Sequence, residues 1–141
     1  MPPKVSFLPA TRKHRLEMKV INELELPENY ELAYWEGYIA QHRSQVAMLS
    51  GQAIGYCLCS VEGHIISLAV RKEHQGKGYG KQLLRRVIVA NPQLTYSLHV
   101  RSTNQRAINL YQSLDFKIEE VLPKYYDAET DGYHMIRMPC C

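Results

Sequence analysis

The residues whose spacing most clearly indicates chemistry form a glycine-rich stretch, Gln-Gly-Lys-Gly-Tyr-Gly, from Gln75 to Gly80. It follows an apolar run over 64–70 and precedes an amphipathic segment over 81–90, which predicts strand, turn and helix. The first N–H groups of a helix have no intrahelical partner, and glycines let an anion approach them closely. Lys77 and Lys81 add positive charge. The stretch therefore predicts a phosphate-binding turn, with an ordinary strand-to-helix connection as the alternative.

The spacing excludes two common phosphate loops, because no Gly-Lys-Ser/Thr follows and Gln75 occupies the first glycine position of a dinucleotide fingerprint. The stretch resembles instead the Gln/Arg-x-x-Gly-x-Gly/Ala turn of the GNAT superfamily of N-acetyltransferases, with Gln75, Gly78 and Gly80 at the defined positions. The resemblance implies that the turn binds the pyrophosphate of acetyl-CoA and that backbone groups of the preceding strand bind its pantetheine arm. The cofactor-binding residues it implies here are Leu68, Ala69, Val70, Gln75, Gly76, Lys77, Gly78, Tyr79, Gly80 and Lys81.

A second motif lies some 30 residues later, where Asn104, Ala107 and Tyr111 fall on one face of a predicted helix. In isolation, a capping asparagine and a core-facing tyrosine are the favoured interpretation of this pattern. The motif resembles the family's Asn-x-x-Ala-x-x-x-Tyr, which implies that Asn104 and Ala107 contact pantetheine and that Tyr111 lies near the thioester sulfur. A phenol with a pKa of about 10 can give a proton or a hydrogen bond to a thiolate leaving group whose pKa is about 8.5. Tyr111 is therefore our candidate catalytic acid.

Four further segments resemble the catalytic subunits of NatA-type protein N-terminal acetyltransferases. In chain order they are Leu26-Pro27-Glu28-Asn29-Tyr30, the strand over 64–70, Ser97-Leu98-His99-Val100-Arg101 and Pro123-Lys124-Tyr125-Tyr126. The matches occur in the family's order and extend over essentially the whole chain. They imply transfer of an acetyl group to the α-amine of a protein N-terminus.

The chemistry of such an amine indicates which side chains could serve it. An α-amine has a pKa near 7.7–8.0, so about one-tenth to one-fifth of it is neutral at pH 7 and a weak base acting through water suffices. Glu28 and His99 are the candidate bases. Tyr125 and Tyr126 can close over the first residue of a peptide and hydrogen-bond its backbone.

The remaining substrate-binding candidates are Pro27 and Tyr30 in the first interhelical loop, and Arg101, which either steadies that loop or binds an acidic substrate residue. Each candidate has a structural alternative. Glu28 could cap the second helix, His99 could be a satisfied core histidine like His64, and the tyrosine pair could simply pack between layers.

Composition places limits on the function. The chain has 141 residues, 45% of them hydrophobic and 22% charged, with a net charge of +3. No basic run with interleaved aromatics indicates nucleic acid, and no long apolar run or signal peptide indicates a membrane. Of four cysteines, Cys57 and Cys59 are expected as buried thiols on one face of a strand, and Cys140 and Cys141 in a mobile end. None matches zinc-finger spacing, so we expect no metal. Since no membrane-spanning or signal-peptide pattern is found, we expect a cytoplasmic protein.

The predicted order of elements is β-α-α-β-β-β-α-β-α-β-β, with a tight turn at 50–52 and another at 62–63. Thr11 is the expected N-cap of a first helix over 12–24, in which Leu16, Val20 and Leu24 have helical spacing. This order predicts an α+β class, a mixed α/β three-layer sandwich, and it matches the GNAT acyl-CoA N-acyltransferase fold. The expectation is one domain over residues 1–141, and the resemblance implies a mostly antiparallel central sheet whose middle strands splay apart.

Departures from the family leave other functions open. Gln75 replaces the more usual arginine, the connection at 62–63 is short, and the family's long polar tail is absent. Dependence on an auxiliary subunit and on the ribosome therefore stays open. The competing functions are a lysine or small-amine acetyltransferase, and an idle scaffold that only binds acetyl-CoA.

Overall fold

The computed structural model describes residues 3–139, and its elements follow the predicted order. The strands are β1 (Ser6–Pro9), β2 (Gln45–Leu49), β3 (Gln52–Cys59), β4 (His64–Val70), β5 (Tyr96–Arg101), β6 (Lys117–Asp127) and β7 (Thr130–Arg137). The helices are α1 (Arg15–Glu25), α2 (Leu32–Ile39), α3 (Tyr79–Ala90) and α4 (Gln105–Ser113), with short 3-10 turns at Arg12–His14 and Lys72–His74.

The strands form one sheet in the order β1-β2-β3-β4-β5-β7-β6. Neighbours are antiparallel except for the central pair, β4 and β5, which is parallel. A parallel pair needs a crossover connection, and α3 supplies it. The prediction of a mixed, mostly antiparallel sheet is confirmed.

The two central strands separate soon after they meet. Within residues 3–139, β4 and β5 pair at His64–Ser97 and Ile65–Leu98 and at no later position. On its other side, β4 shifts register against β3 between Ser67 and Ile65, leaving Ile66 without a partner. A bulge bends its strand, and this one lies directly after the last pair with β5. The bulge thus marks the point where β4 leaves β5, and the predicted splay is confirmed.

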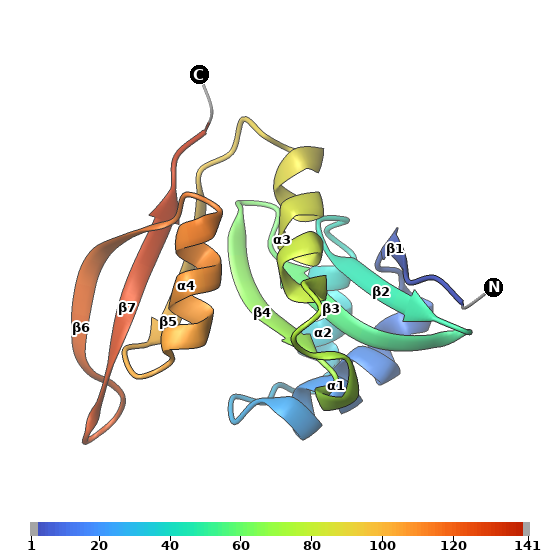
Figure 1. The fold of residues 1–141 in the computed structure, drawn as a ribbon, viewed down its shortest axis with the longest axis horizontal. Helices are drawn as coiled ribbons and strands as arrows, with labels where there is room; N and C mark the ends of the chain where they lie inside the picture. The colour runs from blue at the N-terminus through green and yellow to red at the C-terminus, as the bar shows by residue number, and fades with distance from the viewer. Residues whose placement is uncertain (1–2, 140–141) are drawn as a thin grey trace.

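Helices cover the sheet in two layers, and Figure 1 shows α3 and α4 over the two halves that separate between β4 and β5. The alternating side chains of β3 point to opposite faces, so the strand is buried on both. One apolar cluster joins α3 and α4 to the sheet and includes Leu83, Leu84 and Ile108. The other joins α1 and α2 to the opposite face through Met18, Ile21 and Trp35. The three-layer arrangement is confirmed.

Cysteines 57 and 59 are buried in one apolar cluster, as the Cys-x-Cys spacing predicts. Burial raises the pKa of both thiols, to about 12 for Cys59. Cys140 and Cys141 lie outside the described residues.

Helix α1 differs from its prediction in two respects. Its buried positions are Met18, Ile21 and Asn22, whereas Leu16, Val20 and Leu24 are 54%, 44% and 64% exposed. Both triplets have helical spacing, so periodicity alone does not identify the face that packs on the sheet. Thr11 caps the 3-10 turn that precedes α1 rather than α1 itself.

Candidate active site

The glycine-rich turn has the backbone that its sequence predicts. Gly76 and Gly78 have φ angles of 81° and 84°, in the left-handed region that favours glycine, and Gly78 is the N-cap of α3. A Cβ atom at either position would meet nothing within 4 Å, so the turn presents open backbone. At Gly80 a Cβ would lie 3.6 Å from Leu110 and 3.9 Å from Val70, which leaves space for little more than a methyl group. An anion can therefore approach the first N–H groups of α3 directly.

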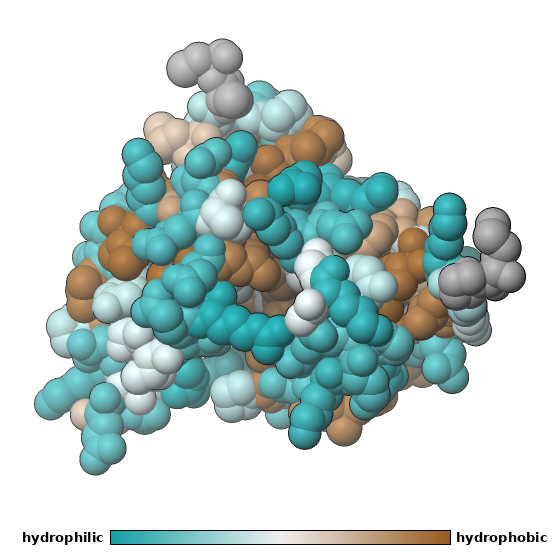
Figure 2. Space-filling model, viewed as in Figure 1, coloured by the Kyte–Doolittle hydropathy of each residue, from teal (hydrophilic) through white to brown (hydrophobic). Residues whose placement is uncertain are grey.

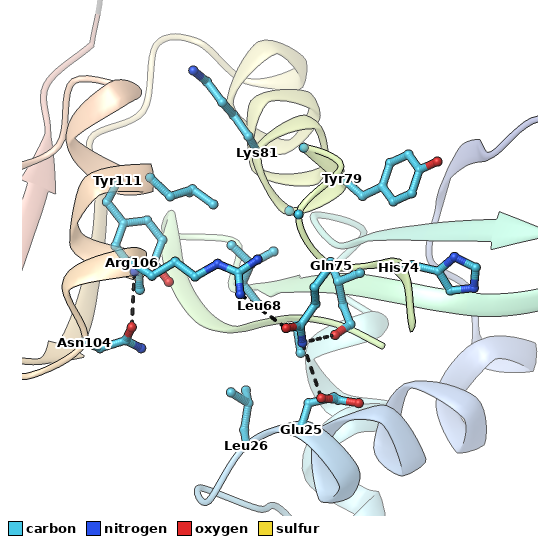
Figure 3. A pocket seen from close by; sticks show the side chains of 17 residues that line it. Glu25, Leu26, Leu68, His74, Gln75, Tyr79, Lys81, Asn104, Arg106 and Tyr111 are labelled. Carbon is cyan, nitrogen blue, oxygen red and sulfur yellow. Dashed lines mark hydrogen bonds between the residues drawn. The ribbon is translucent and has the colours of Figure 1, made fainter. Parts of the chain in front are cut away.

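A cavity of about 540 Å³ lies between this turn and α4 (Figure 3). Every predicted cofactor residue lines it except Lys77, which is exposed and outside it. Five further residues that sequence reasoning did not identify also line it: Glu25, Leu26, His74, Arg106 and Leu110. Figure 2 shows apolar side chains in the hollow between the two halves of the molecule, with hydrophilic side chains around it. The cavity can thus hold a long ligand that is anionic at one end and apolar along its length.

A second cavity, of about 760 Å³, adjoins the first. All the predicted substrate and base residues line it, namely Pro27, Glu28, Tyr30, His99, Arg101, Tyr125 and Tyr126. Five residues line both cavities: Leu26, Leu68, Asn104, Ala107 and Tyr111. The two cavities are therefore parts of one continuous site that passes through the gap between β4 and β5.

The Glu28 carboxylate is bound by the Arg101 guanidinium, although the two residues are 73 positions apart. Its Oε1 accepts hydrogen bonds from Arg101 Nη2 at 2.7 Å and Nε at 3.1 Å. Arg101 Nη1 also lies 3.5 Å from Asp127 Oδ2, and the guanidinium stacks on Tyr126 at 4.6 Å. The N-cap of α2 is Glu31, so Glu28 does not have the capping role that was the alternative. Arg101 links the first interhelical loop to the β6–β7 hairpin across the cavity.

Two asparagines hydrogen-bond the loop that carries Glu28. The buried Asn22 donates from Nδ2 to the Glu28 carbonyl at 2.9 Å. Asn29 Nδ2 donates to the Leu26 carbonyl at 3.0 Å and to Asn22 Oδ1 at 3.1 Å. Tyr30, at the end of the loop, stacks on Tyr34 with ring centroids 4.5 Å apart. The loop is therefore positioned by specific contacts.

His99 lies in a cluster of rings on neighbouring strands. Its ring stacks on Tyr125 at 5.1 Å and on His134 at 5.0 Å, and its edge contact with His64 is at 5.2 Å. Desolvation, followed by the charge of His134, lowers the pKa of His99. His64 Nδ1 is 2.8 Å from Ser97 Oγ, consistent with the structural role considered for His64. His99 is thus neutral at pH 7 and faces the second cavity.

Asn104 and Tyr111 occupy the two ends of α4 that the motif predicts. Asn104 Oδ1 accepts the Ala107 N–H at 3.2 Å, so the capping alternative describes this asparagine correctly. Tyr111 packs on Phe116 with ring centroids 5.9 Å apart and also lines both cavities. Burial raises the pKa of Tyr111, which keeps the phenol protonated and able to donate.

The fold and the site together define a class of protein: one that binds an anionic, extended cofactor at a glycine turn and a second reactant in an adjoining cavity across split parallel strands. Residues 9–116 match the acetyltransferase (GNAT) family, and this chain belongs to that family.

Two relatives carry more specific names. The chain is 35% identical over 141 residues to the N-terminal acetyltransferase A complex catalytic subunit NAA10 of Arabidopsis thaliana, covering 89% of this chain and 73% of that protein. It is 33% identical to an N-alpha-acetyltransferase of Sulfurisphaera tokodaii, covering 82% of this chain and 81% of the relative.

Solved structures share the fold. Ard1 from Thermoplasma volcanium superposes with a TM-score of 0.88 at 22% identity, covering 97% of this chain and 99% of the other. Arabidopsis thaliana Naa50, in complex with the bisubstrate analogue CoA-Ac-MVNAL, superposes with a TM-score of 0.84 at 24% identity, covering 94% and 97%.

Two further findings concern residues 3–139. No helix in this part of the chain combines the length and apolar character needed to cross a bilayer. No group of three or more histidine, cysteine, aspartate or glutamate side chains there is arranged to hold a metal ion.

Proposed function

We propose that residues 1–141 form one N-acetyltransferase domain that transfers the acetyl group of acetyl-CoA to the free α-amine of protein N-termini. The observation that carries this proposal is the continuity of the two cavities through the gap between β4 and β5. A thioester placed in the gap would be reached from one side by the cofactor and from the other by an amine. The names of the relatives at 33% and 35% identity support the same reaction.

Direct transfer in a ternary complex fits the thiols that the structure describes. A covalent acetyl-cysteine intermediate needs a reactive thiolate. Cys57 and Cys59 are buried, and burial holds both pKa values high, so neither thiol ionises readily. The amine would therefore form its C–N bond to the acetyl carbonyl carbon as the C–S bond breaks.

His99 is the better candidate for the base that receives the proton from the amine. Its lowered pKa leaves the imidazole neutral at pH 7, and it lines the second cavity. Glu28 Oε1 already accepts two hydrogen bonds from Arg101. Glu28 would act chiefly through its negative charge, which attracts the α-ammonium group and orients it before deprotonation. Tyr111 lines both cavities, and its raised pKa keeps the phenol protonated, so it would donate a hydrogen bond or a proton to the departing thiolate.

The aromatic wall of the second cavity favours a peptide over a small amine. Tyr125 and Tyr126 lie edge to face with ring centroids 5.0 Å apart, and they line the cavity together with Tyr30 of the interhelical loop. Phenol hydroxyls there can hydrogen-bond the first peptide groups, while the rings enclose the first side chain. A small amine would use none of these contacts.

A partner subunit and cytoplasmic, ribosome-associated action are further parts of the proposal. The Arabidopsis relative is named as the catalytic subunit of a complex. On this chain, the exposed apolar residues Leu16, Val20 and Leu24 of α1 are suited to such a partner. Efficient turnover of peptides by the purified chain alone would show that no partner is required for catalysis.

The first experiment measures acetyl transfer from acetyl-CoA to peptides with free Ser, Ala, Met or Glu N-termini, and to a lysine peptide with a blocked N-terminus. We expect transfer to the free α-amines. Transfer to lysine alone would contradict the proposal and indicate a lysine acetyltransferase. Tight cofactor binding without any transfer would indicate an idle scaffold or a missing subunit.

Two variants separate the candidate bases in the same assay. His99→Gln should lower kcat about 100-fold, the contribution typical of a general base, with little change in KM. Glu28→Gln should act mainly on KM for the peptide, because it removes the charge that orients the amine. The reverse pattern would assign the base to Glu28.

A further inference from the structure

Three side chains from separate elements meet across the first cavity, the one between the glycine-rich turn and α4, which we call the cofactor cavity. Glu25 ends α1, Gln75 begins the glycine turn, and Arg106 lies in the first turn of α4. Figure 3 shows the Gln75 side chain between the other two. Arg106 Nη1 donates to Gln75 Oε1 at 3.3 Å, and Gln75 Nε2 donates to Glu25 Oε1 at 3.3 Å. These contacts connect both walls of the cavity.

The hydrogen bonds of Gln75 determine what it can offer a ligand. Besides Glu25, Nε2 also donates to the Val70 carbonyl at 2.8 Å. An amide nitrogen has two hydrogens, so both have acceptors within the protein. The opposite orientation of the amide would bring its oxygen to a carboxylate and a carbonyl, which excludes it. Gln75 therefore holds the Arg106 guanidinium and has no N–H left for an anion.

Arg106 is the best placed cation in the cavity. The other basic side chains that line it are His74 and Lys81, and in Figure 3 both extend away from Gln75, while the Arg106 guanidinium points toward it. A guanidinium carries a fixed charge and several donors in a planar fork that matches phosphate oxygens. Only Nη1 is engaged with Gln75 among the contacts of the described residues, so the remaining donors can serve a ligand.

We propose that Arg106 binds the diphosphate of the cofactor from the α4 side, with Gln75 as the residue that positions it. The proposal rests on acetyl-CoA being the co-substrate, as proposed above. The glycine turn and the first N–H groups of α3 would contact the diphosphate from one side, and the guanidinium would close over it from the other. The Glu25 carboxylate would repel the diphosphate, because it lines the same cavity and lies 3.3 Å from the Gln75 amide.

The test measures cofactor affinity by calorimetry for the wild-type chain, Arg106→Ala and Arg106→Lys. We expect Arg106→Ala to weaken acetyl-CoA binding about tenfold and Arg106→Lys to recover part of the loss, since lysine keeps the charge without the fork. Arg85→Ala is the matched control, because Arg85 is an exposed arginine of α3 that does not line the cavity. Unchanged affinity in Arg106→Ala would overturn the proposal.

Truncated ligands identify the part of the cofactor that Arg106 contacts. We expect Arg106→Ala to weaken the binding of 3′-dephospho-CoA by the same tenfold factor as the binding of CoA. A smaller loss of affinity for 3′-dephospho-CoA would show that Arg106 contacts the 3′-phosphate, which would overturn the diphosphate contact. S-acetylpantetheine lacks phosphates, so its kcat/KM, measured in the linear range of concentration, should be unaffected by Arg106→Ala. A tenfold loss of kcat/KM with this substrate as well would show that Arg106→Ala disturbs the structure and does not remove a phosphate contact, which would overturn the proposal.

Two more variants test the roles of Gln75 and Glu25. Gln75→Ala should weaken acetyl-CoA binding in the wild-type background and have no further effect in Arg106→Ala, because it acts through the arginine. Glu25→Gln should tighten binding two- to threefold by removing a like charge. Independent, additive losses from Gln75→Ala would overturn the positioning role. Failure of the wild-type chain itself to bind acetyl-CoA would instead overturn the proposed function.

Discussion

The two cavities of the site are built by different means. At the end suited to an anion, the cofactor cavity is formed by backbone: two glycines with positive φ, the first turn of α3 and the free edge of β4. The second cavity is formed by side chains from the α1–α2 loop, α2, β4, β5, α4 and the β6–β7 hairpin, and the Glu28–Arg101 ion pair and stacked rings join several of them. A backbone site accepts few changes at its glycines, whereas a side-chain site can change its specificity residue by residue. The difference predicts where a substitution abolishes function and where it only alters it.

The largest effect is expected from Gly80→Trp. An indole at this position would fill the space toward Leu110 and Val70, where even a Cβ lies at 3.6 and 3.9 Å, and would occupy the cavity. Acetyl-CoA binding should weaken by about 1,000-fold, or roughly 4 kcal/mol, as measured by calorimetry. Gly37→Trp is the control, because Gly37 is exposed on α2 and a Cβ there meets nothing within 4 Å. Retained affinity in a folded Gly80→Trp chain would contradict the location of the cofactor site.

Tyr111→Phe should have the next largest effect, because Tyr111 belongs to both cavities. Removal of the hydroxyl leaves the packing against Phe116 in place and eliminates the acid. We expect kcat to fall about 100-fold while the acetyl-CoA dissociation constant changes less than about twofold. An unchanged kcat would assign Tyr111 to the core, the alternative that its spacing left open.

Arg101→Ala should affect the second cavity alone. The Glu28 and Arg101 side chains are 37% and 30% exposed, so the ion pair contributes at most about 1 kcal/mol to stability and serves mainly to position the loop. We expect kcat/KM for peptides to fall about tenfold, with acetyl-CoA affinity unchanged. Arg101→Lys should restore part of the activity. An equal loss of cofactor affinity would show that the two cavities are not separable in this way.

The same difference explains which features the sequence could predict. The turn is a contiguous stretch, and glycines at fixed spacing specify its backbone directly, so Gln75, Gly78 and Gly80 could be identified as a unit. Alternating and helical periodicities likewise predicted the order of the strands and helices. The splay of β4 from β5 came from the family resemblance, and its structural marker, the unpaired Ile66, has no signal in the sequence.

Contacts between distant segments could not be predicted from local patterns. The ion pair joins positions 73 apart, and the stacking of His99 on His134 follows from the pairing of β5 with β7. Glu25 and Arg106 were missed because an acidic residue ending one helix and a basic residue beginning another resemble ordinary surface charges. The exposed face of α1 was ambiguous because both Met18 and Leu16 belong to apolar stripes.

The smallest effect concerns acid stability, and it again distinguishes the second cavity. Burial is the largest cause that lowers the pKa of His64 and His99, and both line this cavity. Below a pH of about 6.5 the unfolded chain, whose histidines have ordinary pKa values, binds more protons than the folded chain. The free energy of unfolding should therefore fall as pH decreases through this range.

Thermal melts of the wild-type chain between pH 7.5 and 5.5 measure this slope. The double variant His64→Gln, His99→Gln should have a shallower slope, because two groups that resist protonation in the folded state are removed. His42→Asn is the control, since His42 is exposed and its φ of 58° suits asparagine. Part of the slope should persist in the double variant, because burial also lowers the pKa of His14, the N-cap residue of α1. If the double variant has the same slope as the wild type, His64 and His99 do not contribute to the pH dependence of the free energy of unfolding. The second cavity would then differ from the first in its contacts alone.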